Sequence, residues 1–166
     1  LSDTPEVIEC FDISHLSGTS MVGSMVQFRN GVPDKKNYRR FKINTVEGID
    51  DAASIGEIVK RRYHRLIEEN TDLPDLIIID GGKGQLSAAM EVLGDLDLAI
   101  PVIAVAKREE EVYVPGEMLP RRLDPKGMAL RYIQEIRDEA HRFAITYHKL
   151  LRGKKMTGSD TPPGRT

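Results

Sequence analysis

The chain has 166 residues, of which 40% are hydrophobic and 30% charged, which suits one folded domain and argues against a wholly disordered protein. Its 24 Lys and Arg and 26 Asp and Glu give a net charge of -2, so any surface for a polyanion must be local. One cysteine, Cys10, excludes an internal disulfide and an all-cysteine zinc site. No stretch is apolar enough to cross a membrane and no signal peptide is visible, which favours a soluble protein of a reducing compartment. Because the chain begins with Leu1 and not Met, we expect it to be a piece of a longer protein.

The N-terminal part of the sequence predicts three antiparallel strands. Residues 6–13 are mostly apolar and predict a buried strand, and residues 20–29 alternate loosely and predict a second, after a turn at Gly18. Asn30-Gly31 is a strong hairpin signal. The charged stretch 36–43 then suits a third strand at the outer edge of the sheet.

The remainder of the sequence alternates between helix and strand patterns. Helical spacing of apolar residues begins after Asp50-Asp51 and ends near Asn70. The predicted elements that follow are a central strand 76–80, a helix 85–96, a strand 101–106, a hairpin within 112–119 around Pro115-Gly116, and a last helix with Asp124 as N-cap and Pro125 in its first position. We expect a flexible N-terminus at 1–5, one domain at 6–155 and a disordered tail or linker at 156–166.

This order of elements predicts the fold class. Three antiparallel strands followed by parallel strands that alternate with helices indicate an α/β protein with a mixed sheet flanked by helices on both faces.

Three side chains are unusual for their predicted positions. Asp12 ends a hydrophobic strand and Asp80 ends the apolar run of residues 76–80, where an ionised carboxylate needs a cation or strong hydrogen bonds. Either aspartate could instead cap a turn. His141 lies at the border of the apolar stripe of the last helix, where a structural role is the commoner one.

Two further features have a structural and a functional interpretation. Asp50 and Asp51 suit a helix N-terminus, although one of them could turn inward as a metal ligand. The stretch Gly81-Gly82-Lys83-Gly84-Gln85 lacks the pattern of a P-loop, and its glycines favour a close approach of backbone or phosphate.

Positive charge is clustered in three segments. Residues 35–42, 60–65 and 142–155 hold 14 of the 24 cationic side chains. Such segments are usually solvated surfaces, but three of them interleaved with aromatic residues on a net-acidic chain favour a track for a phosphate backbone.

Together these motifs closely resemble the C-terminal endonuclease domain of the UvrC family, the incision subunit of bacterial nucleotide excision repair. The resemblance covers residues 6–155 and rests on five stretches in this order: Phe11-Asp12-Ile13-Ser14-His15, Asp50-Asp51-Ala52-Ala53, Lys60-Arg61-Arg62-Tyr63, residues 79–86 around Asp80-Gly81-Gly82-Lys83, and residues 136–144 around His141.

The resemblance implies an RNase H-like fold and a metal-dependent DNA endonuclease that hydrolyses a phosphodiester bond. It implies that Asp12, Asp80 and His141 are catalytic and hold Mg²⁺ or Mn²⁺, with Asp51, next to Asp50, as a further acidic position. His141 could bind a metal or act as an acid or base. The basic residues expected to contact DNA are Lys83, Arg61, Arg62, Arg137, Arg142, Lys149 and Arg152.

The same resemblance implies a biological setting. The domain would make the 5′ incision in damaged double-stranded DNA, in the cytoplasm and away from membranes. It would meet a UvrB–DNA complex through parts of the full-length protein that are absent from this chain. The alternatives are a non-catalytic DNA-binding module on the same scaffold, another RNase H-like repair endonuclease, and a nucleotide- or partner-binding α/β domain.

Overall fold

The computed structural model describes residues 4–15, 21–43, 50–106 and 111–156, with the side chains of 148 and 151–156 left out. The expected turn at Gly18 and the expected tail from 157 onward therefore lie outside the described residues. The elements are β1 (Val7–His15), β2 (Met21–Arg29), β3 (Val32–Pro33), the 3₁₀ helix η1 (Lys35–Asn37), β4 (Arg39–Lys42), α1 (Asp51–Glu68), β5 (Leu76–Asp80), α2 (Lys83–Asp95), β6 (Val102–Val105), β7 (Glu111–Tyr113), β8 (Arg121–Arg122) and α3 (Met128–Met156).

The described strands form one mixed sheet, as the sequence predicts. Its order is β3-β2-β1-β5-β6-β7-β8, and β4 also pairs with β2. β1 is antiparallel to β2 but parallel to β5, and β5 is parallel to β6. The mixed α/β class is thereby confirmed.

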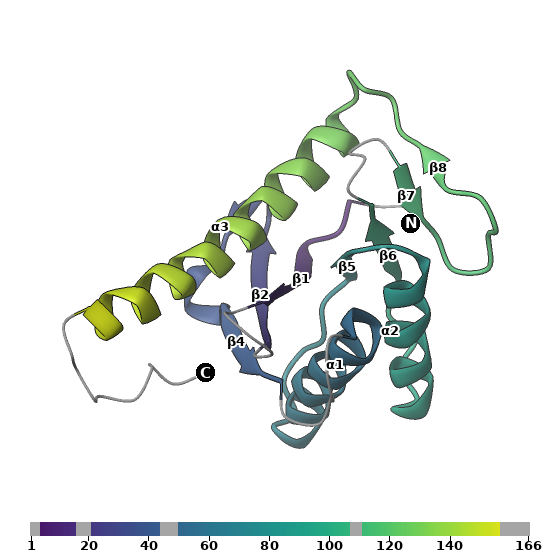
Figure 1. Ribbon diagram of the computed structural model, residues 1–166. Helices are drawn as coiled ribbons and strands as arrows, with labels where there is room; N and C mark the ends of the chain where they lie inside the picture. The colour runs from purple at the N-terminus through teal and green to yellow at the C-terminus, as the bar shows by residue number, and fades with distance from the viewer. Residues whose placement is uncertain (1–3, 16–20, 44–49, 107–110, 157–166) are drawn as a thin grey trace.

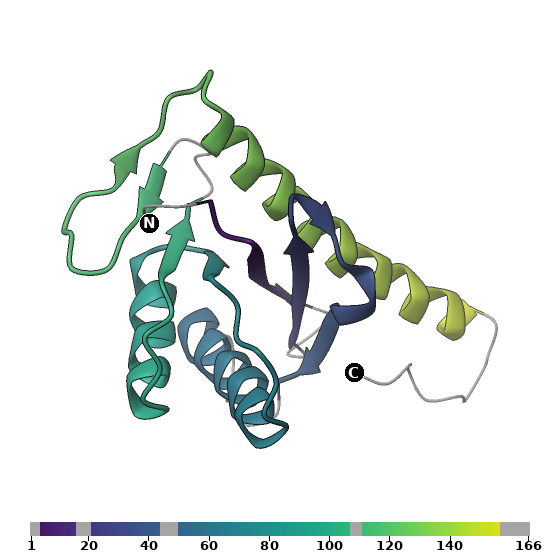
Figure 2. The ribbon, with the colours of Figure 1, turned by 180° about the vertical axis from the view of Figure 1, so that it is seen from behind.

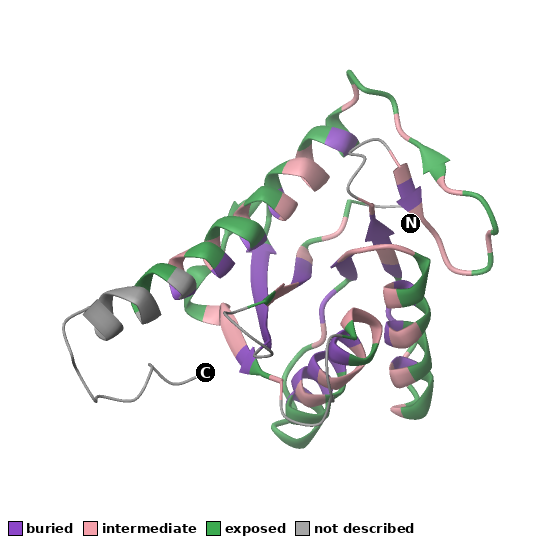
Figure 3. Cartoon of the chain, viewed as in Figure 1, coloured by how far each residue is buried: buried purple, intermediate pink, exposed green. Residues whose placement is uncertain are grey.

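Helices cover the two faces of the sheet. α3 crosses one face over β1 and β2, whereas α1 and α2 lie side by side on the other face (Figures 1 and 2). The central strands and the inward sides of the helices are buried (Figure 3). Successive residues of β1 point to opposite faces, so Cys10 packs in the apolar cluster under α3 and Phe11 in the cluster under α1 and α2. Asp12, two residues after Cys10, consequently faces α3.

Local sequence explains why α1 begins and ends where it does. Asp50 is its N-cap, and the Asp50 carboxylate accepts a hydrogen bond from the backbone N–H of Ala53 at 3.0 Å. The predicted apolar stripe is buried. After Glu68 the chain turns through Asn70, whose φ of 53° is left-handed and tolerated by asparagine.

The third strand differs from the expectation for 36–43. The Asn30-Gly31 turn is confirmed, with φ of 53° and 84°, but the chain pairs with β2 immediately afterwards in the short β3. Asp34 then accepts the side-chain N–H of Asn37 at 2.8 Å, and this local bond supports the 3₁₀ turn η1. The ladder with β2 resumes only at Arg39, so the predicted strand is interrupted and shorter.

The last helix begins later than predicted. Asp124 and Pro125 form a turn: Gly127 N–H donates to the Asp124 carbonyl at 2.9 Å and Lys126 N–H to the Asp124 carboxylate at 3.0 Å. Asp124 therefore caps this turn, and α3 starts at Met128.

The small hairpin also differs from the prediction in extent. The turn at Pro115-Gly116 is present, with a φ of 83° at Gly116. The strand that returns to β7 is β8, beyond the predicted end at 119.

None of the described helices has the length and apolar character needed to cross a membrane.

Candidate active site

Two aspartates meet at the carboxyl ends of neighbouring parallel strands. Phe11 of β1 is the register partner of Ile79 of β5, so the next residues along the two strands, Asp12 and Asp80, come side by side. Asp12 is 6% exposed, and its Oδ2 is buried with no hydrogen-bond partner among the described atoms. The edge of the sheet thus carries two adjacent carboxylates at the position where α/β folds place ligands.

The electrostatics of this pair follow from its burial. Loss of water around Asp12 and the charge of the neighbouring Asp80 raise the pKa of Asp12 to about 7, and Asp51 adds to the effect. The same two aspartates help burial to raise the pKa of the Cys10 thiol beneath them. A cation at this point would relieve the repulsion.

His141 reaches the aspartates from α3. Its Nδ1 lies 3.8 Å from Asp12 Oδ2, and its side chain is 66% exposed. The structure therefore brings together Asp12, Asp80 and His141, any two of which are at least 61 positions apart along the chain. An exposed imidazole beside a buried carboxylate can exchange protons with water and with a bound substrate.

The structure separates Asp50 from Asp51. Asp50 is exposed and serves as the N-cap of α1, whereas Asp51 Oδ1 lies 3.3 Å from Nε2 of His15, at the end of β1. The charge of Asp51 also raises the pKa of Asp12, by less than the charge of Asp80 does. Of the two candidates, Asp51 is thus the one near the aspartate pair.

The glycine-rich stretch after Asp80 has a structural explanation. The Gln85 side chain folds back, so that Gly82 N–H donates to Gln85 Oε1 at 3.1 Å. A Cβ on Gly81 would lie 2.9 Å from Gln85 Cγ, so only glycine fits there without displacing that side chain. The motif holds the start of α2 directly behind Asp80.

Two of the basic residues expected to contact DNA lie close to the aspartates. Lys83 is exposed in the first position of α2, three residues after Asp80. Arg137 of α3 is one turn from His141, has a side chain only 15% exposed and donates to the carbonyl of Ala106 at 3.5 Å. Arg137 also opposes the two aspartates in their effect on the Cys10 pKa.

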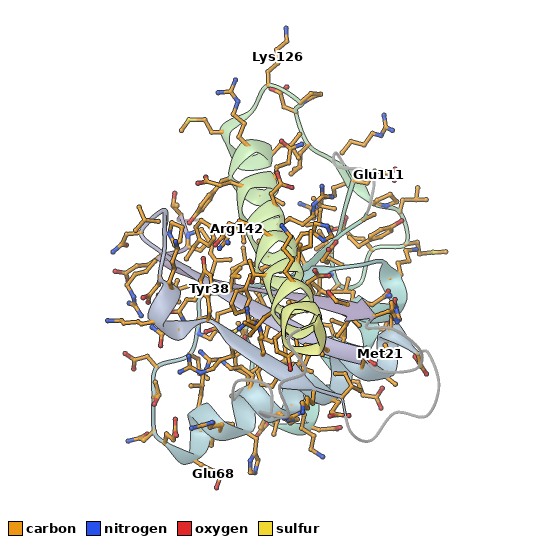
Figure 4. The ribbon with its side chains drawn as sticks, turned by 60° about the vertical axis from the view of Figure 1, so that its left-hand side comes forward. Met21, Tyr38, Glu68, Glu111, Lys126 and Arg142 are labelled. Carbon is orange, nitrogen blue, oxygen red and sulfur yellow. The ribbon has the colours of Figure 1, made fainter. Side chains whose placement is uncertain are left out.

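The other expected DNA contacts on α3 lie further along the helix. Arg142 is 53% exposed and donates two hydrogen bonds to Glu139, of 2.6 and 2.7 Å. Tyr38 donates to the same carboxylate. Figure 4 labels Arg142 and Tyr38 among the side chains. Lys149 is exposed. The side chain of Arg152 lies outside the described residues.

Arg62 corrects the expectation that it faces DNA. It is 6% exposed, and its guanidinium donates to both oxygens of Glu9, at 3.2 and 2.7 Å. Tyr63 and Gln27 donate to the same carboxylate, so Glu9 accepts from three side chains. Sequence reasoning missed Glu9, although a charged residue inside an apolar strand was a visible signal. Arg62 is therefore a core residue, whereas Arg61 is partly exposed and paired with Glu57 at 3.1 Å.

The donor set suits a hard divalent cation. Asp12 and Asp80 offer carboxylate oxygens, the ligands that Mg²⁺ and Mn²⁺ prefer, and His141 offers an imidazole nitrogen. The buried, unpartnered Asp12 Oδ2 is the observation that fits best, since such an atom is costly without a cation or donor. Over the described residues, no three His, Cys, Asp or Glu side chains already stand as close as a formed metal site requires.

A mixed sheet with paired carboxylates at the ends of β1 and β5 and a helix over them defines an RNase H-like domain, and comparison with known proteins agrees. The family model for the UvrC RNase H endonuclease domain matches residues 1–145, and the chain belongs to this family. It is 67% identical over 156 residues to UvrABC system protein C of Methanosarcina barkeri and 52% identical over 168 residues to that of Flavobacterium psychrophilum. These alignments cover 94% and 99% of the chain but 30% and 28% of the relatives.

Solved structures give more distant similarities. Endonuclease V of Ciona intestinalis, in complex with inosine-containing DNA, is 16% identical with a TM-score of 0.47, covering 62% of this chain and 46% of that one. Thermus thermophilus RuvC is 15% identical with a TM-score of 0.35, covering 62% of this chain and 63% of that one.

Proposed function

We propose that the domain is a divalent-metal-dependent DNA endonuclease that makes the 5′ incision in nucleotide excision repair. The observation that carries this proposal is the meeting of Asp12, Asp80 and His141 at one edge of the sheet. Membership of the UvrC RNase H endonuclease domain family supports the reaction class. Damaged double-stranded DNA in the cytoplasm is the proposed substrate, and a UvrB–DNA complex is the proposed partner of the longer protein.

The chain's own residues have distinct tasks in this reaction. Asp12 and Asp80 would hold Mg²⁺ or Mn²⁺, with Asp51 as a further acidic group nearby. When bound, such ions stabilise the charge of the attacking and leaving oxygens and lower the pKa of water. Asp12 is fixed by its strand and by burial, so its carboxylate is preorganised.

The groups around the aspartates complete the site. His141, exposed beside Asp12, would hold a metal or move a proton at Nδ1 or Nε2. Lys83 and Arg137 flank the aspartates and would position the backbone phosphates next to the scissile one. Arg61, Arg142, Lys149 and Arg152 would extend this contact along the duplex. Arg62 is left out of this set because it is buried and paired with Glu9.

The test is cleavage of a labelled duplex by the 166-residue chain. With Mn²⁺ or Mg²⁺ we expect cut products with no strong sequence preference, and none in EDTA. Cutting that persists in EDTA would contradict a metal-dependent reaction. Metal-independent binding without any cutting, also in the presence of the partner complex, would favour the alternative of a DNA-binding module.

A further inference from the structure

A small pocket lined by arginines lies between β4 and α1. It encloses about 120 Å³ at the outer edge of the sheet. Its lining consists of Phe41 and five arginines: Arg39, Arg40, Arg61, Arg62 and Arg65. Two of the basic segments seen in the sequence, 35–42 and 60–65, therefore converge on one concave site.

The carboxylates around this pocket do not balance its positive charge. Glu9, Glu57 and Glu69 pair with Arg62, Arg61 and Arg65 respectively. Arg39 donates only to the carbonyls of Lys36 and Tyr38, and Arg40 donates to Thr146. The Arg40 guanidinium lies on the other face of the sheet, over the Phe143 and Tyr147 rings of α3. Over the part of the chain that the structure describes, Arg39 has no carboxylate partner, which leaves the pocket an excess of one positive charge.

The positive charges of the pocket arginines also repel one another. Burial, followed by the charges of Arg62 and Arg65, lowers the pKa of Arg39. An oxyanion in the pocket would offset this repulsion and accept charge-assisted hydrogen bonds from the guanidinium groups around it.

The register of the sheet fixes where this pocket lies relative to the aspartate pair. Asp12 is the partner of Ser24, and Ser24 is the partner of Arg40. Two strand spacings therefore separate the Asp12 and Arg40 backbones, or about 10 Å. Asp12 faces α3, whereas Phe41 and Met25, the register partner of Arg39, pack under α1 and α2, so the pocket lies at the β4 edge on the other face of the sheet from the aspartates.

We propose that the arginine pocket binds a backbone phosphate of DNA and is a contact separate from the aspartate site. This inference rests on the proposed function, since its ligand is the same DNA. The pocket would position the duplex and add affinity without reading sequence. Arg39 and Arg65 would bind the phosphate, and Arg62, held by Glu9, would form the floor.

The test is the salt dependence of duplex binding by the 166-residue chain. Binding is measured by the fluorescence anisotropy of a labelled 20-base-pair oligonucleotide in EDTA. The variants are Arg65→Gln, Arg39→Gln and the double variant, with Arg122→Gln as the matched control. Arg122→Gln removes the same charge as the pocket variants. Arg122 is exposed on β8, at the opposite edge of the sheet from β4, so the pocket is unaffected. Arg65 is 67% exposed in its side chain, so Arg65→Gln is expected to fold, and thermal melting checks each variant.

We expect each pocket variant to weaken binding for all sequences and to reduce the slope of log affinity against log salt by about one. The double variant should reduce this slope by about two, and Arg122→Gln should leave the slope unchanged. Pocket variants with the same affinity and salt slope as Arg122→Gln would overturn the inference. If those variants still cut the duplex, the proposed function stands. A wild-type chain that neither binds nor cuts the duplex would overturn both.

Discussion

His141 Nδ1 lies 3.8 Å from Asp12 Oδ2, although one side chain is 66% exposed and the other 9%. α3 crosses the sheet directly over β1, so an open position on the helix reaches the buried carboxyl end of the strand. Asp12 is held by the core, whereas His141 is free to contact solvent and substrate. The two residues therefore combine a rigid carboxylate with an accessible imidazole.

Replacing His141 should separate activity from stability. Because the side chain is exposed and its one described polar contact is 3.8 Å long, His141→Ala should change the free energy of unfolding by about 0.5 kcal/mol or less. Duplex cleavage should fall by at least about 100-fold, the usual contribution of an acid–base group. Urea unfolding and a cleavage time course measure the two effects. His64→Ala, at another exposed histidine, is the control and should keep full activity.

Asp12 should make stability depend on pH. Its pKa is raised from 3.8 to about 7 in the folded state, so between these values the native protein binds more protons than the unfolded one. Stability should therefore fall as pH rises from about 4 to 7, by up to about 4 kcal/mol, and Asp12→Asn should remove this loss. Thermal melts in EDTA from pH 4 to 8 test this. Parallel pH profiles for the two proteins would contradict it.

A divalent metal ion should restore the folding stability that the wild type loses as pH rises. An ion that binds only the folded protein stabilises it by mass action, so Mn²⁺ or Mg²⁺ should raise the Tm of the wild type at pH 8. Asp12→Asn should show a much smaller rise. Equal shifts in both proteins would place the ion elsewhere.

The Arg62–Glu9 pair should be far more important for stability than an exposed pair on the same helix. Arg62→Gln leaves a buried carboxylate without its cation and should cost about 3–5 kcal/mol. Arg65→Gln removes an exposed i,i+4 pair with Glu69 and should cost about 0.5 kcal/mol or less. Urea unfolding of the two variants gives the comparison. Similar costs would show that burial of the Glu9 network is not the deciding factor.

The turn behind Asp80 should show coupling between two positions. Gly81→Ala brings a Cβ to 2.9 Å from Gln85 Cγ and should cost about 1–3 kcal/mol by overpacking. Gln85→Ala removes the acceptor for Gly82 N–H and should cost about 1 kcal/mol. The double variant should cost less than the sum, because Gln85→Ala removes Cγ and Cδ, the two nearest of the atoms in conflict. Additive losses would mean that the two residues act independently.

Most of the fold could be predicted from the sequence because its signals are local. The Asn30-Gly31 turn, the apolar stripe of α1 and the continuous apolar run of β5 each depend on residues within one element. Asp12 and Asp80 were identifiable as candidates because each is a carboxylate at the end of an apolar strand. Their roles, and that of His141, stay predictions.

The differences arise where a long-range contact or a competing local bond decides. Helical spacing puts Arg62 on the apolar stripe of α1, four residues after Ile58, but its buried partner Glu9 comes from β1 and cannot be foreseen from residues 60–65. The Asp124-Pro125 pair suits a helix start and a turn equally, and Gly127 favours the turn. The arginine pocket joins segments of β4 and α1 whose convergence depends on tertiary packing and is not visible in either segment.

The most direct test of the account is incision of a pre-nicked, lesion-containing duplex in Mn²⁺ by the wild type, Asp12→Asn and Asp72→Asn. Asp72 is an exposed aspartate in the loop before β5, so it matches the chemical change without touching the site. We expect cutting on the 5′ side of the lesion by the wild type and Asp72→Asn, and none by Asp12→Asn with a folded melting curve. Incision by Asp12→Asn at the wild-type rate would contradict the central claim that Asp12 and its neighbours form the active site.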